Sequence, residues 1–101
     1  MASTPEGKVK TRVKKLLDQY GALHFSPQGT GYGVSGVSDI IVLYKGRFVA
    51  IECKADEKKL PTALQLKFLE RVRAWGGIGL VIHSGNLDLL QNTMDILGEE
   101  A

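Results

Sequence analysis

The sequence is poor in cysteine, proline and aromatic residues, and it has no long apolar run. The single cysteine, Cys53, cannot form an internal disulfide or a cysteine pair for a metal, which fits a reducing compartment. No apolar stretch approaches the roughly 20 residues of a membrane span, and the N-terminus has no apolar signal region. We therefore expect a soluble, cytoplasmic protein with no membrane partner.

Neither sign of charge dominates, because 13 lysine and arginine residues against 11 aspartate and glutamate residues leave a formal net charge of +2. Residues 1–15 nevertheless contain one acid, Glu6, and five cations: Lys8, Lys10, Arg12, Lys14 and Lys15. This run is typical either of a surface for a polyanionic partner or of a solvated helix face. The length of 101 residues predicts one domain over residues 1–101.

The first element is predicted to be a helix. Thr4 is a good N-cap, Pro5 suits the first helical position, and Gly21 is a stop signal. At about 100° per residue, Glu6 falls within the apolar stripe of this helix rather than on its basic face. Its carboxylate is therefore expected at the edge of the core. The stripe consists of Val9, Val13, Leu16, Leu17 and Tyr20.

A hairpin is predicted next. Strands at 37–44 and 47–54 meet at a tight turn, Lys45-Gly46, and both faces of the pair are apolar enough to be covered by helices. Residues 22–25 are a candidate short strand. Between this candidate strand and the hairpin lies the glycine-rich stretch "SPQGTGYGVSG", whose glycine spacing matches no dinucleotide-binding fingerprint.

The second half of the chain predicts a helix, a strand and a helix. The first helix runs from Thr62 to a cap at Gly76, and its stripe of Leu64, Phe68, Val72 and Trp75 places Trp75 in the core. The strand at 78–83 then lies parallel to the second hairpin strand through a crossover. With a last helix at 86–97, the fold class is α/β, a mixed sheet around a central β-hairpin with helices on both sides.

The charged residues of the hairpin form one constellation. With a two-residue loop at Lys45-Gly46, counting outward puts Asp39 opposite Glu52, with Cβ atoms about 5 Å apart. Lys54 projects from the same face, whereas Cys53 points to the opposite face and is expected to fill the core. Two adjacent carboxylates repel each other unless a proton or a cation intervenes, and a hard divalent cation suits their oxygens.

Two alternatives stay open on spacing alone. An odd loop or a bulge would shift the register. Asp39 and Glu52 could also be strand-end residues that reach solvent, and Glu52 with Lys54 could be an ordinary ion pair.

The order of these residues resembles the PD-(D/E)XK nuclease superfamily, with Asp39 on one strand and Glu52-Cys53-Lys54 on the next. The stretches "GVSDIIVL", "FVAIECKA" and "LPTALQLKFLERVRAWGG" more narrowly resemble the VRR-NUC group of virus-type replication-repair nucleases. The likeness spans almost the whole chain and implies a restriction-endonuclease-like αβββαβ core. Ser38 stands where the superfamily's name has proline.

The resemblance implies a role for each matching residue. Asp39 and Glu52 would bind Mg²⁺ or Mn²⁺ together with the backbone carbonyl of Cys53, and Lys54 would assist the attacking water. The helix-borne Glu6 would complete the metal shell, directly or through water. Gln65 would match the glutamine that follows the E-x-K strand and would position Lys54 or a phosphate.

The resemblance also implies an activity, metal-dependent endonucleolytic hydrolysis of DNA in a bacterial or virus-infected cell. A domain this small has little surface, and pairing two copies would extend it. The resemblance implies such a homodimer, acting on branched DNA such as a four-way (Holliday) junction. A sequence-specific restriction-like nuclease and an inactive DNA-binding or assembly module are the alternatives. The candidate DNA contacts, each with a plain surface position as its alternative, are Gly31, Gly33, Lys8, Lys58 and Lys59.

Overall fold

The computed structural model describes residues 4–27 and 35–100. The elements in this part of the chain are α1 (Pro5–Tyr20), β1 (Leu23–Phe25), β2 (Ile40–Tyr44), β3 (Arg47–Cys53), α2 (Ala63–Ala74), β4 (Ile78–Ile82) and α3 (Leu87–Glu100). Within the same ranges, no helix is both long enough and apolar enough to cross a membrane.

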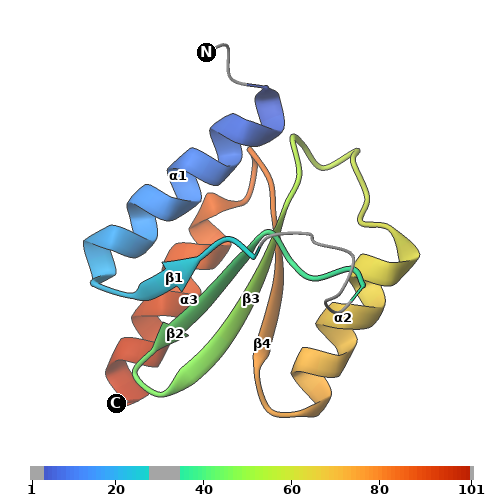
Figure 1. Cartoon of the computed structure of the whole chain (residues 1–101). Coiled ribbons are helices and arrows are strands. Elements are labelled where there is room, and N and C mark those ends of the chain that lie inside the picture. Colours follow the sequence, from blue (N-terminus) through green and yellow to red (C-terminus); the bar gives the residue numbers. More distant parts are fainter. Residues whose placement is uncertain (1–3, 28–34, 101) are drawn as a thin grey trace.

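The strands form a mixed sheet in the order β1-β2-β3-β4, in which β1, β2 and β3 are antiparallel and β4 runs parallel to β3. Helices α1 and α3 lie on one side of the sheet and α2 on the other (Figure 1). This arrangement confirms the α/β fold class and the parallel strand. The hairpin has helices on both sides, as predicted, but near its turn Leu43 and Phe48 stay exposed on the side of α2. The larger core lies between the sheet and α1 and α3, and it includes Val13, Leu17, Ile51, Cys53 and Met94.

Local signals account for α1. The Thr4 side chain accepts a hydrogen bond from the Gly7 N–H, Pro5 occupies the first turn, and Gly21 ends the helix with a φ of 69°. The apolar stripe faces the core, where Val9, Val13 and Leu17 are buried. Because Glu6 lies three residues before Val9, its side chain emerges at the end of α1 beside the sheet.

The hairpin turn confirms the predicted register. Lys45 and Gly46 have φ values of 52° and 77°, as a two-residue type I′ turn requires. Pairing then proceeds without a bulge from Tyr44↔Arg47 to Ile40↔Ile51. Because the side-chain period of a strand is two, every odd position of β2 shares a face with an even position of β3. Counting one step beyond the last pair brings Asp39 beside Glu52.

Strand β2 is shorter than predicted, beginning at Ile40 rather than at residue 37. The backbone ladder stops because the Cys53 N–H donates to the side-chain Oδ2 of Asp39, at 2.8 Å, instead of to a backbone carbonyl. Gly36, immediately before the predicted start, has a φ of 73°, a left-handed turn conformation that favours glycine. Residues 37–39 follow this turn and do not belong to the strand. At the other end, α3 runs to Glu100, past the predicted end at residue 97.

The prediction that Trp75 lies in the core is wrong. Helix α2 ends at Ala74, and Trp75 follows it as an exposed C-cap residue. The helical stripe cannot be extended past the last helical residue, and α2 is rotated so that Leu69 and Val72 are its buried residues. Leu64, from the same predicted stripe, is also exposed.

Candidate active site

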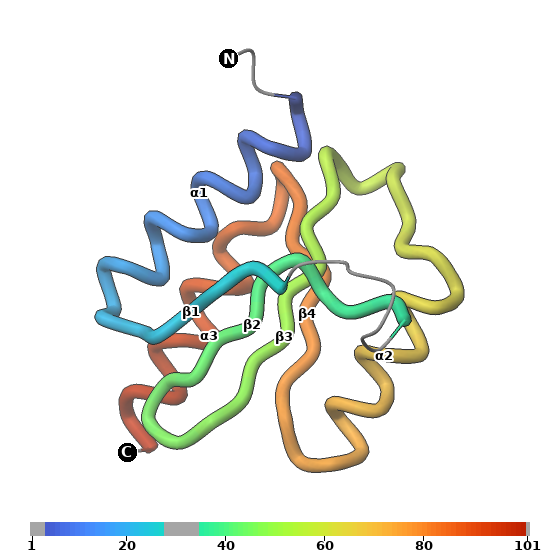
Figure 2. The backbone as a smooth tube through the Cα atoms, in the orientation of Figure 1, coloured from blue at the N-terminus to red at the C-terminus, as the bar shows by residue number. Residues whose placement is uncertain are grey.

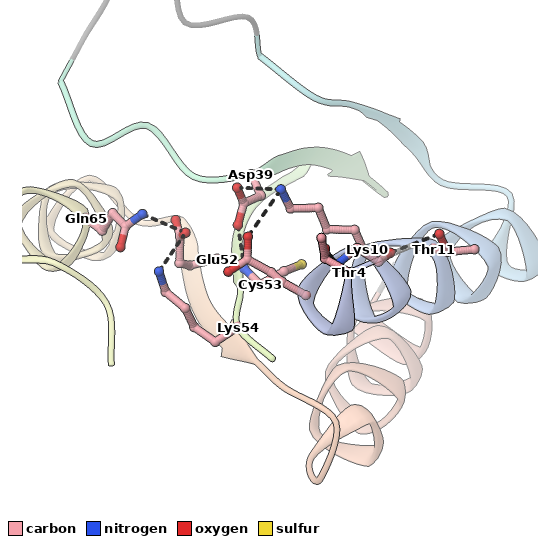
Figure 3. Close-up of polar contacts among 10 residues, drawn as sticks. Thr4, Lys10, Thr11, Asp39, Glu52, Cys53, Lys54 and Gln65 are labelled. Atoms are coloured by element: carbon pink, nitrogen blue, oxygen red, sulfur yellow. Dashed lines mark hydrogen bonds and ion pairs between the residues drawn. The ribbon is translucent and has the colours of Figure 1, made fainter. Parts of the chain in front are cut away.

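Four of the predicted site residues meet where β2 begins and β3 ends. Glu52 is almost fully buried, and its Oε1 lies 2.9 Å from Nε2 of Gln65, which donates to it, and 3.7 Å from Nζ of Lys54. Figure 3 shows Gln65 and Lys54 on one side of Glu52, with Asp39 on the other. The cross-strand pair predicted from the turn is thus present, and the helix-borne glutamine joins it.

The carboxylate of Asp39 is held by the backbone. Its Oδ2 accepts from the Cys53 N–H, so the side chain is tied to the end of β3, between Glu52 and Lys54 in the sequence. Its Oδ1 faces Nζ of Lys10 at 3.4 Å. One oxygen therefore sets the orientation of the group, and the other meets a positive charge.

Glu52 carries the main electrostatic strain of the site. Of the described residues, none donates a hydrogen bond to its buried Oε2. Burial, followed by the neighbouring Asp39, raises the pKa of Glu52 to about 8, and Lys54 only partly offsets this. A buried carboxylate oxygen without a donor is costly when charged. The group therefore favours either a proton or a cation at this oxygen.

Gln65 is oriented by the start of its own helix. Its Oε1 accepts from the Thr62 N–H at 2.8 Å, while the Thr62 side chain accepts from the Gln65 N–H, a reciprocal capping box. Because the amide oxygen is already in use, the amide NH₂ points to Glu52. The sequence signal for this arrangement is T-x-x-Q at residues 62–65.

Gly36 lets the chain pass against the same helix start. A Cβ at this position would lie 2.3 Å from the backbone oxygen of Leu64, far inside van der Waals contact. At Gly36 the glycine therefore serves the close approach of the chain to α2. Gly31 and Gly33, the predicted DNA contacts of that stretch, lie outside the described residues.

Lys10 is a site residue that sequence reasoning missed. Its Nζ lies between two carboxylates, 3.5 Å from Oε2 of Glu6 and 3.4 Å from Oδ1 of Asp39. Partial burial opposes its charge, but Asp39 and Glu6 outweigh this and raise the pKa of Lys10. Its i,i+4 spacing from Glu6 could have indicated that pair, whereas the contact with Asp39 depends on how α1 packs on the sheet.

The remaining predicted residues surround this centre. Glu6 and Lys54 line an open groove of about 460 Å³ together with Lys58 and Lys59. Figure 2 traces the start of α1 alongside the loop after β3 that carries both lysines. Lys8 is exposed on α1 and does not line this groove. Three cations thus border a hollow next to the carboxylates.

The Cys53 side chain takes no part in this chemistry. It is fully buried in the larger core, as predicted, and burial followed by the nearby Asp39 raises the pKa of its thiol to about 12. The thiol therefore stays protonated and is a poor nucleophile or metal ligand. Only the backbone of this residue is available to the site.

The residues present fit a hard divalent cation. Asp39 and Glu52 offer oxygen donors, and the buried, unpartnered Oε2 of Glu52 is the atom that needs a positive partner most. Within residues 4–27 and 35–100, no three acidic, histidine or cysteine side chains converge on one point. A third ligand would therefore be a backbone carbonyl, as predicted for Cys53, or water. Glu6 could bind directly only if Lys10 moved aside.

An acid before one buried strand, an E-x-K sequence on its hairpin partner and a glutamine on the following helix are the arrangement of PD-(D/E)XK nucleases. The solved structure of a VRR_NUC domain superposes on 96% of this chain and 97% of its own, with a TM-score of 0.73 and 30% sequence identity. A scan against models of protein families and a search of curated proteins gave no match. On the structural match, the chain belongs to the VRR-NUC family, and its fold is that of a PD-(D/E)XK-type nuclease.

Proposed function

We propose that this protein is a divalent-metal-dependent DNA endonuclease that uses Mg²⁺ or Mn²⁺. The observation that carries the proposal is the pairing of Asp39 with the buried Glu52, whose Oε2 has no donor among the described residues. Lys54 and Gln65 are in direct contact with the same carboxylate. A structural ion pair would not require a second, repelling carboxylate beside it.

Each residue has a separate task in this proposal. Asp39 and Glu52, with the carbonyl of Cys53, hold the cation, which when bound offsets charge on the scissile phosphate and favours ionisation of the attacking water. Lys54 orients that water and stabilises the negative charge that develops on the phosphate. Gln65 holds the Glu52 carboxylate in place, and the Thr62 cap holds Gln65.

Hydrolysis then consumes one water for each bond cut. The water oxygen attacks phosphorus, the bond between phosphorus and the leaving oxygen breaks, and that oxygen acquires a proton as it departs. The groove bordered by Lys54, Lys58 and Lys59 is the side from which a phosphate would approach, because its cations neutralise the backbone charge.

For the substrate we propose branched DNA, with a four-way junction as the preferred form. One chain of this size carries one pair of carboxylates, whereas resolving a junction needs two cuts related by symmetry. A homodimer supplies two such sites about a two-fold axis. The expectation of a dimeric, junction-resolving enzyme comes from the family resemblance.

A cleavage panel tests this function. Labelled four-way junction, flap, single-stranded and linear duplex DNA are each incubated with the protein in Mg²⁺, Mn²⁺ or chelator. We expect symmetric cuts in the junction that need metal. Cutting of linear duplex at one short sequence would replace the junction proposal with a restriction-like one. No cleavage of any substrate in the presence of metal would contradict the proposed activity.

A further inference from the structure

The sheet face that carries Asp39 and Glu52 also has a set of large apolar side chains exposed to solvent. Leu23, Phe25, Leu43, Phe48 and Trp75 are 67%, 58%, 49%, 42% and 87% exposed. We call these five residues the apolar row. Isolated exposed apolar residues are ordinary, but a contiguous set of this kind marks an interaction surface.

The five residues are contiguous although they come from three strands and the C-cap of α2. Leu23 pairs with Leu43, and Leu43 pairs with Phe48, so the three side chains stand in line across β1, β2 and β3. Phe25 lies two residues beyond Leu23 on the same face. At the other end, Phe48 and Trp75 line one groove of about 330 Å³ at the end of α2.

Helix α2 leaves this row uncovered because of where it packs. It contacts β3 and β4, with Leu69 and Val72 over Ala50. Ile41 of β2 still packs with this cluster, but Leu23, Phe25 and Leu43 on the same face of β1 and β2 lie beyond it and are exposed.

The area of the row matches what a stable dimer buries. With ~200 Å² for a fully exposed aromatic side chain and ~100 Å² for a leucine, the row exposes roughly 500 Å². A standard interface covers about 800 Å² per partner, of which about 60% is apolar. The row alone therefore supplies the apolar part of one such interface.

We propose that the apolar row is the surface at which two copies of this chain meet. This inference rests on the homodimer of the proposed function and assigns its contact surface. A two-fold axis places the same patch of both copies in contact, so the patch must be complementary to itself. A line of uncharged side chains meets this condition because it brings no like charges together.

The chemistry of the row disfavours DNA as the occupant. Binding to DNA depends on cations that neutralise phosphates, and of the described residues that line the groove at Trp75 only Arg71 is charged. The row also shares no residue with the carboxylate site. It crosses β3 at Phe48, four residues or roughly 13 Å from Glu52.

Trp75 makes the test direct, because it is the single tryptophan of the chain. The full-length protein is diluted in steps while its mass is followed by light scattering and its tryptophan emission is recorded. We expect twice the chain mass at high concentration and a red shift of the emission as the dimer dissociates. A protein with the mass of one chain and red-shifted emission at every concentration would overturn the proposal, whatever other protein binds the row.

Two variants and one control locate the contact. Trp75→Glu and Leu43→Lys should each raise the dimer dissociation constant about 30-fold or more, as central interface residues do. Leu66→Glu, which changes an exposed leucine on the other flank of α2, should leave it unchanged. All three should keep the wild-type far-ultraviolet circular dichroism. A wild-type dimer that persists in both row variants would place the contact elsewhere and reject the assignment.

The outcomes also separate this inference from the activity. Loss of dimer in the row variants with retained Mn²⁺ binding and impaired junction cutting supports both proposals. A stable dimer that cuts no DNA supports the row and contradicts the nuclease. Metal-dependent cutting by a protein that is always a monomer contradicts the row alone.

Discussion

The two ends of one sheet face differ in how far their side chains are satisfied by contacts within the chain. Around Glu52, Asp39, Lys10, Lys54 and Gln65 are joined by hydrogen bonds and ion pairs within the chain, although Oε2 of Glu52 has no donor among the described residues. At Phe48, four residues earlier on the same strand, the side chains are large, apolar and in solvent. The first region is organised before any ligand arrives, whereas the second is stable in water only at a cost that a partner would remove.

The two regions differ in the geometric precision that they need. The carboxylate site uses directional contacts that fix individual atoms, as the proposed positioning of a phosphate would require. The apolar row needs only shape and area, so it is built from side chains with no polar atom to satisfy.

Removing one group of the carboxylate site should abolish its activity without unfolding it. Asp39→Asn keeps the shape of the side chain but removes the negative charge, and Lys54→Ala removes the ammonium at 3.7 Å from Glu52. We expect loss of cleavage on the order of 10³-fold or more, with junction binding largely retained in gel-shift assays. Asp88→Asn, on the exposed side of α3, is the matched control and should cut normally. A fully active Asp39→Asn protein would contradict the metal assignment.

Crowding the start of α2 should destabilise the whole domain. In Gly36→Ala the new Cβ would meet the Leu64 oxygen at 2.3 Å, and the residue has a positive φ. We expect a loss of about 3 kcal/mol or more in the free energy of unfolding, measured by urea denaturation. Gly46→Ala has a similar φ but open space, so it should cost only about 1 kcal/mol. Equal losses of unfolding free energy in the two variants would show that the close contact of Gly36 with α2 does not affect stability.

The pH dependence of stability should report the strain at Glu52. Its folded pKa, about 8, lies above the ordinary value of 4.5. The protonated form therefore stabilises the fold fully below about pH 4.5, and this contribution is lost as pH rises through 8. In chelator, Glu52→Gln should be more stable than wild type by about 2 kcal/mol above pH 8, with little difference near pH 5.

Metal should reverse this difference. Added Mn²⁺ should raise the thermal midpoint of the wild type at high pH, because the cation pairs with the ionised carboxylate. The same addition should shift Glu52→Gln much less. If Glu52→Gln is no more stable than wild type in chelator at high pH, the carboxylate is not strained and the case for a cation there weakens.

The smallest effect should come from Lys10. Its ammonium already neutralises Asp39 and Glu6, and so it competes with a bound cation. Lys10→Met should therefore tighten Ca²⁺ or Mn²⁺ binding by about 5- to 10-fold, or about 1 kcal/mol, in calorimetry. Lys14→Met, one turn further along α1, is the control for general charge and should change the affinity less. Weaker binding in Lys10→Met would mean that Lys10 supports the site instead of competing for it.

Much of the carboxylate site could be predicted because it depends on local signals. The Lys45-Gly46 turn sets the register, and a strand period of two carries that register to Asp39 and Glu52 without any knowledge of the rest of the fold. The glutamine was predicted through the family resemblance, although the T-x-x-Q capping box that orients it was visible in the sequence. The individual roles of these residues stay predictions until they are tested.

The failures have a different origin. Trp75 was placed in the core because a helical pattern was continued past the end of its helix, and the rotation of α2 depends on its packing against β3 and β4. Lys10 was assigned to a basic face because its partner Asp39 is 29 positions away in the sequence. Neither error could be corrected from spacing within one element.

Caps, turns and side-chain periods act over a few residues, and so the elements, the register of the hairpin and the pairing of two carboxylates on one face follow from the sequence. The contact of Lys10 with Asp39, the passage of Gly36 against α2 and the exposure of the apolar row depend on tertiary packing. These features arise where distant segments pack. The fit between two surfaces depends on the shape and rotation of both, which no local pattern encodes.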